Sequence, residues 1–502
     1  MTVMRVGGLA SGMDMDAIIK DYMAAKRIPL DKLEQEKQIL KWQQEDYRSL
    51  NSALFSFRDE VFDMKLQSAF NLKTAASSAE DVVNVTAGAS TAEGTYSITV
   101  NSLASGVTKG STAELAGAQD EEGNNRSLYE QFSEFGVRGF VETDTVSVAI
   151  NGNELEFNLG EDTIFTVVSK INSAGLGVTA SYDTNYNRFF LATNSTGSEA
   201  EITVSADEAN LLAKGVNNSI LGLNLDEGSD YNGQNASISI GDAANLESSS
   251  NTMTVNGLNL DLQAEGSSTV VVSRDVETIV ESITGLIESY NSIMENLYTK
   301  IQEKKHYDYS PLTDAQKKEM SETEIELWEA RAKSGILRGD SQLNTIVNKI
   351  RTAMSRVVGG VQGQYKTLSS IGISTRMWDD NGQLYIDETT LREALSEDPE
   401  GVKALFASSG EIDGNKGIAN YLYDAVGFGI TYLSNKAGQE SSFITVDNSF
   451  IGNRLSRLDL EIEKWEQKLI ESEDRYWRQF TYMEKVINQM NAQSAWLTQQ
   501  FQ

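Results

Sequence analysis

Hydrophobic residues recur every seven positions at both ends of the chain, whereas apolar and polar residues alternate through much of the middle. Near the N-terminus the repeat comprises Leu33, Leu40, Tyr47, Leu54 and Val61. Near the C-terminus it comprises Leu455, Ile462, Leu469, Tyr476, Met483, Met490 and Leu497. Such a repeat places one apolar stripe along a helix, and a single helix cannot remove that stripe from water. We therefore expect the terminal helices to pack on each other or on other chains.

The two stripes differ in length, because the N-terminal helix is expected over about residues 30–66 and the C-terminal helix from about residue 447 to the end. Part of the longer stripe therefore lacks a partner within the chain, although an ordinary intramolecular hairpin remains an alternative for the rest. Polar residues such as Ser472, Gln479 and Gln493 interrupt the second line of the C-terminal repeat. This pattern favours exchangeable contacts with neighbouring subunits, and an imperfect permanent coiled coil remains open.

The first residues precede the N-terminal helix and are rich in glycine. Residues 1–13 contain Gly7, Gly8 and Gly12, so we expect them to lack order in an isolated subunit. A short amphipathic stretch follows. Pro29 then stands where the first residue of a helix would be, a position at which its missing N–H costs little.

The middle of the chain predicts short strands. Val83–Thr86 and Tyr96–Val100 alternate in hydrophobicity, and residues 104–127 are polar and are expected to form a flexible connection. Over 145–205 two alternating runs flank Asn151-Gly152, a helix follows, and a second hairpin completes a ββαββ unit. Further strand–Asn-Gly–strand patterns are expected at 253–262 and between Met377 and 384–386.

Helical periodicity returns in the second half, over residues 275–302, 313–333 and 341–358. Asp398 is expected to cap a short helix that begins at Pro399. The expected fold class is α+β and multidomain, with terminal α-helical coiled-coil legs and inserted β-rich head domains. The expected domains are 1–70 (tail and leg helix), 71–135 plus 206–268 (β-rich head), 136–205 (ββαββ head), 269–440 (mixed leg domain) and 441–502 (C-terminal coiled-coil helix).

Composition narrows the possible partners and compartments. The formal net charge is −31, which argues against nucleic acid and anionic membranes as partners. The chain has no cysteine, so disulfides and thiolate metal sites are excluded. The sequence has no apolar run long enough to span a membrane, and its N-terminal residues do not resemble a secretory signal peptide. We therefore expect either a cytoplasmic protein or export by a route that reads no such signal.

Residues that could perform chemistry are few. His306 is the only histidine and is interpreted as a surface residue, since no triad or multi-histidine metal site can be built around it. Asp379-Asp380-Asn381-Gly382 resembles part of a calcium loop, but it lacks the full ligand spacing and is better explained as a hairpin turn. The sequence has no phosphate-binding glycine motif. No catalytic, metal or cofactor residue is assigned, and an enzyme is not expected.

Four sets of residues resemble one protein family. Leu9-Ala10, then Ser11, Gly12, Met13 and Asp14, resemble the opening motif of bacterial flagellar filament-cap proteins, the hook-associated protein 2 family. Gly335–Asp340 is also typical of that family, and the ββαββ unit resembles the flagellin/hook insertion repeat. The C-terminal signature is matched by Leu384, Ile386, Asp387, Leu405 and Phe406, among others. Residues 104–127 and 306–330 show no clear family pattern.

The resemblance implies a non-enzymatic assembly factor at the distal tip of the flagellar filament. Such a protein forms a ring-shaped homo-oligomer, here expected as a pentamer although both five and six subunits occur. It retains exported flagellin and promotes its polymerisation, which filament elongation and motility require. The implied partners are flagellin, the hook-associated junction proteins and a type III export chaperone. The implied location is extracellular, at the filament tip.

Other functions remain open at this stage. A junction protein between hook and filament would share the terminal repeats and the export route. A tip adhesin that binds mucin or host glycans could coexist with capping, although no residue identifies a sugar pocket. A cytoplasmic coiled-coil scaffold is the alternative that does not depend on the resemblance, and a hydrolase with carboxylate catalysis is least favoured.

Overall fold

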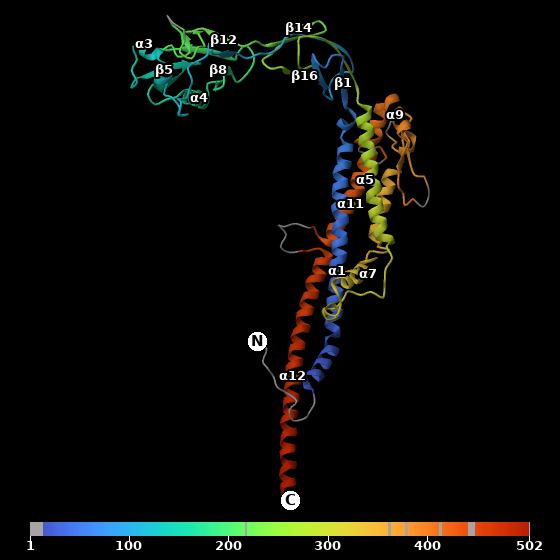
Figure 1. Cartoon of the computed structure of the whole chain (residues 1–502). Coiled ribbons are helices and arrows are strands. Elements are labelled where there is room, and N and C mark those ends of the chain that lie inside the picture. The colour runs from blue at the N-terminus through green and yellow to red at the C-terminus, as the bar shows by residue number, and fades with distance from the viewer. Residues whose placement is uncertain are drawn as a thin grey trace. The chain divides into compact units, whose positions relative to one another are not determined.

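The chain folds into two compact units, each described separately. The computed structural model describes residues 14–215, 218–359, 363–376, 380–410, 414–439 and 447–500. Unit 1 comprises Met1–Phe70 and Val276–Gln502, and unit 2 comprises Asn71–Asp275. A long helix at each end with strands between them confirms the expected α+β multidomain fold (Figure 1).

Unit 1 is mainly helical. Its long helices are α1 (Met15–Lys65), α5 (Val276–Gln302), α8 (Ser341–Met354), α11 (Ile418–Ala437) and α12 (Phe450–Gln500). Its shorter elements are η1 (Gln67–Phe70), α6 (Asp314–Lys318), α7 (Glu322–Lys333), η2 (Leu368–Ile371), β18 (Ile373–Ser374), β19 (Tyr385–Ile386), α9 (Glu388–Glu397) and α10 (Pro399–Ala407). These bounds confirm the helices expected near 275–302, 313–333 and 341–358, the second as two helices.

Helix α1 begins fourteen residues before the predicted Pro29 start. Asp14 caps it by accepting a hydrogen bond from the Ala17 backbone N–H at 3.0 Å. The prediction that Pro29 is a first helical residue is therefore wrong, because Pro29 lies inside the helix. A proline there removes one backbone hydrogen bond, at a cost of about 3 kcal/mol in an isolated helix. The next residue, Leu30, is buried, which indicates that packing offsets this cost.

The C-terminal half of α1 forms the centre of the unit 1 core with α11 and α8. A methyl group built on Gly429 of α11 would lie 3.2 Å from Leu54 Cδ1 and 3.1 Å from Ile346 Cγ2 of α8. The three helices therefore approach closely at this glycine. Tyr47 of α1 donates a hydrogen bond from its hydroxyl to Asp340 Oδ2 at 2.7 Å, and Asp340 also caps α8.

The short hairpin of unit 1 partly matches its prediction. Strand β19 pairs with β18, while Asn381 and Gly382 adopt positive φ angles before it, as an Asn-Gly turn requires. Met377, the predicted partner, lies outside the described residues. Asp398 caps α10 as predicted, accepting from the Gly401 N–H at 2.8 Å.

Unit 2 is β-rich and contains two hydrophobic cores. Its strands in the first half are β1 (Lys73–Ser77), β2 (Val83–Ala87), β3 (Gly94–Ser102), β4 (Thr108–Gly110), β5 (Thr145–Ile150), β6 (Asn153–Asn158), β7 (Val178–Asp183), β8 (Arg188–Thr193) and β9 (Glu201–Ser205). The later strands are β10 (Ala213–Lys214), β11 (Leu225–Asp226), β12 (Asp230–Asn232), β13 (Ala236–Ile240), β14 (Ala243–Ser248), β15 (Thr252–Val255), β16 (Leu258–Leu262) and β17 (Gly266–Arg274). Its helices are α2 (Leu128–Gln131), α3 (Glu134–Val137) and α4 (Ile164–Ser173).

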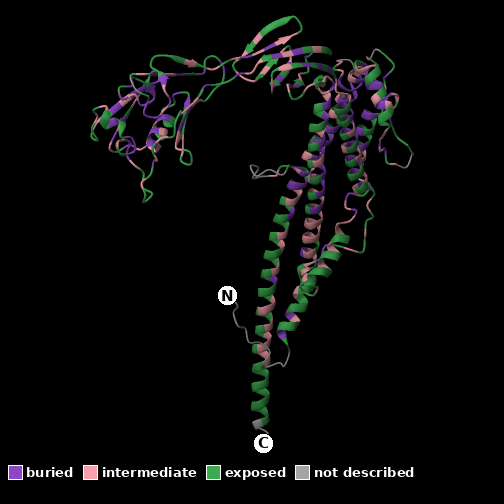
Figure 2. Cartoon of the chain, turned by 45° about the horizontal axis from the view of Figure 1, so that its top comes forward, coloured by how far each residue is buried: buried purple, intermediate pink, exposed green. Residues whose placement is uncertain are grey.

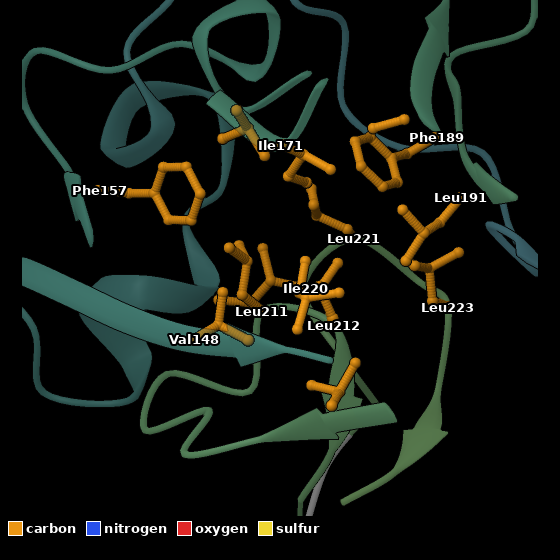
Figure 3. Close-up of a cluster of buried hydrophobic side chains, with 14 of the residues drawn as sticks. Val148, Phe157, Ile171, Phe189, Leu191, Leu211, Leu212, Ile220, Leu221 and Leu223 are labelled. Atoms are coloured by element: carbon orange, nitrogen blue, oxygen red, sulfur yellow. The ribbon is translucent and has the colours of Figure 1, made fainter. Parts of the chain in front are cut away.

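The predicted ββαββ unit is present as β5, β6, α4, β7 and β8. Asn151 and Gly152 both have positive φ, which confirms the predicted turn. Strands β5 and β6 belong to a four-stranded sheet in the order β12-β9-β5-β6, whereas β7 and β8 join β4 in a three-stranded sheet. Figure 3 shows the core between these elements, in which Phe157 and Phe189 lie beside the later residues Leu211 and Leu221.

This first core is larger than the predicted 136–205 domain. It includes Val107, Ala118 and Leu128 before that range and Leu211–Ala213 and Leu225 after it. The predicted boundaries at 135/136 and 205/206 therefore fall inside one hydrophobic cluster. The prediction that residues 104–127 form a flexible connection is wrong, because β4 pairs with β8 and Ala118 is buried.

The second core of unit 2 lies between a five-stranded sheet and a three-stranded sheet. The five-stranded sheet has the order β1-β17-β3-β13-β14, and the other has the order β15-β16-β2. Val83, Ile98, Ile238, Leu258 and Val270 are fully buried in it. Its first and last strands, β1 and β17, are antiparallel neighbours, so the chain enters and leaves unit 2 side by side.

Candidate assembly interface

The terminal helices α1 and α12 run antiparallel and side by side (Figure 1). Near the start of α1, the rings of Tyr22 and Tyr476 stack with centroids 5.6 Å apart. Further along α1, Lys37 pairs with Asp459. The same interface holds an ion pair between Glu36 and Arg454, at 2.7 Å. Residue numbers rise along α1 as they fall along α12, which defines the antiparallel register.

The N-terminal stripe divides into two parts by burial. Tyr47, Leu54 and Val61 are buried within unit 1. They therefore belong to the chain's own core and are not available to a partner, contrary to the predicted partner-binding role. Leu33 and Leu40 are half-buried, in the part of α1 that faces α12. A heptad count could not separate the two parts, since both present the same spacing.

The C-terminal stripe becomes more exposed toward the end of the chain. Five of its residues are half-buried along the pair: Leu455, Ile462, Leu469, Tyr476 and Met483. Met490 and Leu497 are exposed, at 63% and 48%. Because Tyr476 stacks on Tyr22 and α1 starts at Met15, α12 passes the start of α1 near Met483. The last part of α12 is exposed in Figure 2, which colours it green. The prediction that part of the longer stripe has no partner within the chain is thus confirmed for Met490 and Leu497.

The end of α12 beyond Met483 has an unusual composition for this acidic chain. No Asp, Glu, Lys or Arg follows Lys485. The heptad count missed Trp496, which is 57% exposed beside Leu497. The absence of charge was the available sequence signal, because a solvated helix normally carries charged side chains. We call residues 484–500 the α12 tip.

A polar cluster joins α1 to the end of α11 and the start of α12. Gln44 Nε2 donates to the Ala437 carbonyl at 3.0 Å and to Asp447 Oδ2 at 2.7 Å. Arg48 does the same, from Nε to Ala437 at 2.9 Å and from Nη2 to Asp447 at 2.9 Å. Burial acts to raise the pKa of Asp447, but the hydrogen bonds from Ser449 and the charge of Arg48 hold that pKa below its usual value. No local sequence pattern indicated this cluster.

The family-motif residues mostly have structural positions. Ser11, Gly12 and Met13 lie outside the described residues, whereas Asp14 caps α1. Asp387 caps α9 through the Thr389 and Thr390 N–H groups. The remaining motif residues pack inside unit 1: Leu384, Leu405 and Phe406 are buried and Ile386 is half-buried. The ring of Phe406 stacks on Phe70, with centroids 5.6 Å apart.

The described ranges contain no group of three or more acidic or histidine side chains placed to hold a metal ion. His306 is half-buried, and its ring is nearly perpendicular to that of Tyr309, with centroids 6.0 Å apart. Among the helices of the described part, none combines the length and the apolar character needed to cross a membrane. The candidate interface is therefore the pair of helices α1 and α12, whose apolar side chains are half-buried along the pair and exposed at the α12 tip.

Family models match most of the chain. The model described as "Flagellar hook-associated protein 2 C-terminus" matches residues 233–492, and the corresponding N-terminus model matches residues 11–106. A third, "Flagellin hook IN motif", matches residues 147–197. This last range covers most of the ββαββ unit, so the resemblance of that unit to an insertion repeat is supported by an independent comparison.

Whole-length relatives carry the same description. A flagellar hook-associated protein 2 of Halalkalibacterium halodurans is 30% identical, covering 99% of this chain and all of the relative. Those of Thermotoga maritima and Escherichia coli K12 are 25% and 24% identical, covering 99% of this chain and 96% and 97% of their own lengths. The crystal structure of the E. coli flagellar cap protein FliD, domains D1-D2-D3, aligns with a TM-score of 0.52. That alignment has 22% identity and covers 82% of this chain and 99% of that one, so it is evidence of a shared fold.

Proposed function

Because the chain belongs to the flagellar hook-associated protein 2 family, we propose that it acts as the cap of a bacterial flagellar filament. In this proposal several copies form a ring at the distal tip of the filament, outside the cell. The ring retains flagellin subunits that arrive by export and promotes their polymerisation. The role comes from the family, which includes a protein described as the flagellar cap of E. coli, and the helices of unit 1 suggest how it is performed.

The observation that supports the mechanism is the uncovered α12 tip. Met490, Trp496 and Leu497 expose large apolar side chains on a helix that has no neighbour from α1 at that level. Burial of apolar surface contributes roughly 25 cal/mol per Å², so a matching helical partner would bind here. We propose that the tip docks on helices of the filament subunits below the ring.

The docking must also be reversible, since each inserted flagellin changes the subunits beneath the ring. Gln489, Gln493 and neighbouring polar uncharged residues interrupt the apolar side chains of the tip. Contacts of this composition bury less apolar area than an unbroken coiled-coil seam. Beyond Lys485 the tip carries no charged side chain, so a partner can approach that part without desolvating an ion, which would be costly.

We propose no enzymatic step and no cofactor for this role. The junction-protein and cytoplasmic-scaffold alternatives receive no support from the family models or the whole-length relatives. Glycan binding is not proposed, because no described residue argues for it.

Truncation of the α12 tip tests the proposal. A strain that lacks its own cap gene would express either the full chain or a chain that ends at Met483. We expect the truncated chain to be exported and to keep the helix pair with α1, but to leave flagellin in the medium and filaments short. Electron microscopy of filament ends and quantification of flagellin in the supernatant measure both effects.

A matched control separates length from chemistry. Residues 484–500 would be replaced by a helix of equal length with alternating Glu and Lys on every face. This control should fail like the truncation, because it restores the length but not the apolar surface. Normal filaments from the truncated chain would contradict the docking role of the tip. Full-length chains that form no ring at filament ends would contradict the capping role itself.

A further inference from the structure

The start of α12 is attached to the helical core by two buried side chains, Ile451 and Leu458, and by a polar cluster. The cluster is formed by Gln44, Arg48, the Ala437 carbonyl and Asp447. We call these four groups the α12 joint. Each of the two α1 side chains donates to both ends of the connection, the last residue of α11 and the carboxylate that precedes α12. Hydrogen bonds between Arg48 and a carboxylate are charge-assisted and stronger than neutral ones.

The backbone around the joint is shaped to bring Asp447 close. Gly438 ends α11 with a φ of 73°, and a methyl group built on it would lie 2.7 Å from Asp447 Oδ1. Gly452 in the first turn of α12 leaves similar room, since its added methyl group would lie 2.4 Å from the Asp447 carboxyl carbon. Ser449 accepts a hydrogen bond from the Gly452 N–H at 3.0 Å and donates its own N–H to Asp447 at 2.9 Å. Asp447 therefore connects α1 directly to the first turn of α12.

Beyond the first turns of α12, the contacts that hold α12 against α1 are weaker. The stripe residues between the two helices are half-buried, whereas α1 packs on α11 and α8 with fully buried residues such as Leu54. The side chains of the ion pairs Lys37–Asp459 and Glu36–Arg454 are between 30% and 53% exposed, and partly exposed pairs contribute little because water screens them. The side chains of Arg48 and Asp447 are less exposed, at 25% and 29%.

We propose that Gln44, Arg48 and Asp447 are positioning residues that set the direction in which α12 leaves the core of unit 1. While the joint is intact, α12 lies along α1 and its tip points in one direction. When the joint is broken, α12 takes a range of directions relative to α1, and the α1–α11–α8 core keeps its structure. The consequence for capping rests on the proposed function, but the joint itself can be tested on the purified chain.

The absence of cysteine makes spin labelling straightforward. One pair of labels at Lys32 and Gln479, both exposed, would report the distance between α1 and α12. A second pair at Glu60 and Asn435, also exposed, would report the distance between α1 and α11. Double electron–electron resonance gives the distribution of each distance in the full chain.

Two variants break the joint by different means. Asp447→Asn removes the charge and presents an amide donor to Arg48, whereas Gly438→Ala keeps the charge and displaces the carboxylate. We expect either change to broaden the Lys32–Gln479 distribution about twofold and to leave the Glu60–Asn435 distribution unchanged. Asp459→Asn is the matched control, because it removes an exposed carboxylate of the same helix pair, and it should leave both distributions unchanged.

An unchanged Lys32–Gln479 distribution in Asp447→Asn and Gly438→Ala would overturn the proposal. So would an equal broadening in Asp459→Asn, or a broadening of both label pairs together, because the joint would then have no special role in orienting α12. None of these measurements depends on capping. If the joint behaves as proposed but full-length chains form no ring at filament ends, the proposed function fails and the inference about α12 stands.

Discussion

At the scale of single residues, Asp340 combines two structural tasks. Its Oδ1 accepts from the Gln342 and Leu343 N–H groups at 2.9 and 2.8 Å and so caps α8. Its Oδ2 accepts from the hydroxyl of Tyr47, which is 3% exposed. Burial, together with this hydrogen bond, raises the pKa of Tyr47, so the phenol is neutral. The carboxylate thus joins the middle of α1 to the start of α8.

This arrangement predicts an order of stability among three variants. Tyr47→Phe removes one hydrogen bond to a carboxylate that keeps its two backbone donors, so we expect a loss of about 1 kcal/mol in the free energy of unfolding. Asp340→Ala removes the cap and leaves the Tyr47 hydroxyl buried without an acceptor, at a cost of about 3 kcal/mol. Tyr307→Phe is the control, since that residue is 81% exposed. Urea unfolding followed by circular dichroism measures all three, and equal losses in Tyr47→Phe and Asp340→Ala would contradict the assignment.

Residue-level features were predictable where their cause is local. The caps at Asp398 and the turn at Asn151-Gly152 depend on neighbouring residues, and both predictions are confirmed. Pro29 shows the limit of local reasoning. Its ring suits a helix start, but Asp14 starts the helix earlier and the chain continues through Pro29. The partners of Tyr47 and Asp447 are hundreds of residues away in sequence, so no local pattern could indicate them.

At the scale of elements, α12 changes character along its length. Its first turns belong to the core of unit 1, where Ile451 and Leu458 are buried. Its middle has half-buried stripe residues beside α1, and its tip is exposed from Asn488 to Thr498. Heptad spacing predicted the helix and the stripe, because periodicity is a property of the element itself. The spacing could not show which part is buried, since that depends on where α1 begins.

The exposed apolar stripe lies on one side of the tip. We therefore expect an added charge to impair filament growth only when it is placed on that side. Met490→Glu and Leu497→Glu place a carboxylate on the proposed docking face, where loss of water would leave it unpaired. We expect each to shorten filaments and reduce swimming, with no change in the helical content of the purified chain. Asn488→Glu is the matched control, because Asn488 lies on the opposite side of the same helix and is exposed.

Swimming-halo diameter on soft agar and filament length by electron microscopy measure these effects. Normal motility in both Met490→Glu and Leu497→Glu would exclude an apolar docking face at the tip. Equal defects in all three variants would show that any added charge disturbs export or folding, and would leave the face unsupported.

At the scale of the whole molecule, the chain is a helical unit with a β-rich unit inserted between α1 and α5. The change of hydrophobic period near residue 71 predicted where the insertion begins. The predicted end, at residue 268, lies close to the observed end at Asp275. The predicted divisions within unit 2 were misplaced, because the segments at 107–135 and 206–225 contain no long regular strand or helix. Their apolar residues, such as Leu128 and Leu221, are buried in one cluster with residues of distant strands.

The geometry of the insertion predicts that the two units fold independently. The Asp275 N–H donates to the Leu72 carbonyl at 3.0 Å, and β1 pairs with β17 from Lys73 opposite Arg274. The ends of unit 2 are therefore adjacent, so a short linker can replace it without separating α1 from α5. We expect fragment 71–275 to fold alone, and the remaining chain to fold when a Gly-Ser linker joins residues 70 and 276.

Calorimetry of the full chain and of both parts measures this independence. We expect the unfolding temperature of each isolated part to lie within about 3 °C of the corresponding transition in the full chain. For domains of this size, a shift of that magnitude corresponds to a change of about 1 kcal/mol in the free energy of unfolding. A fragment 71–275 that lacks a cooperative transition would mean that unit 2 needs unit 1 in order to fold. In that case the adjacency of its ends would reflect shared stability, and the two hydrophobic cores of unit 2 could not be treated as self-sufficient.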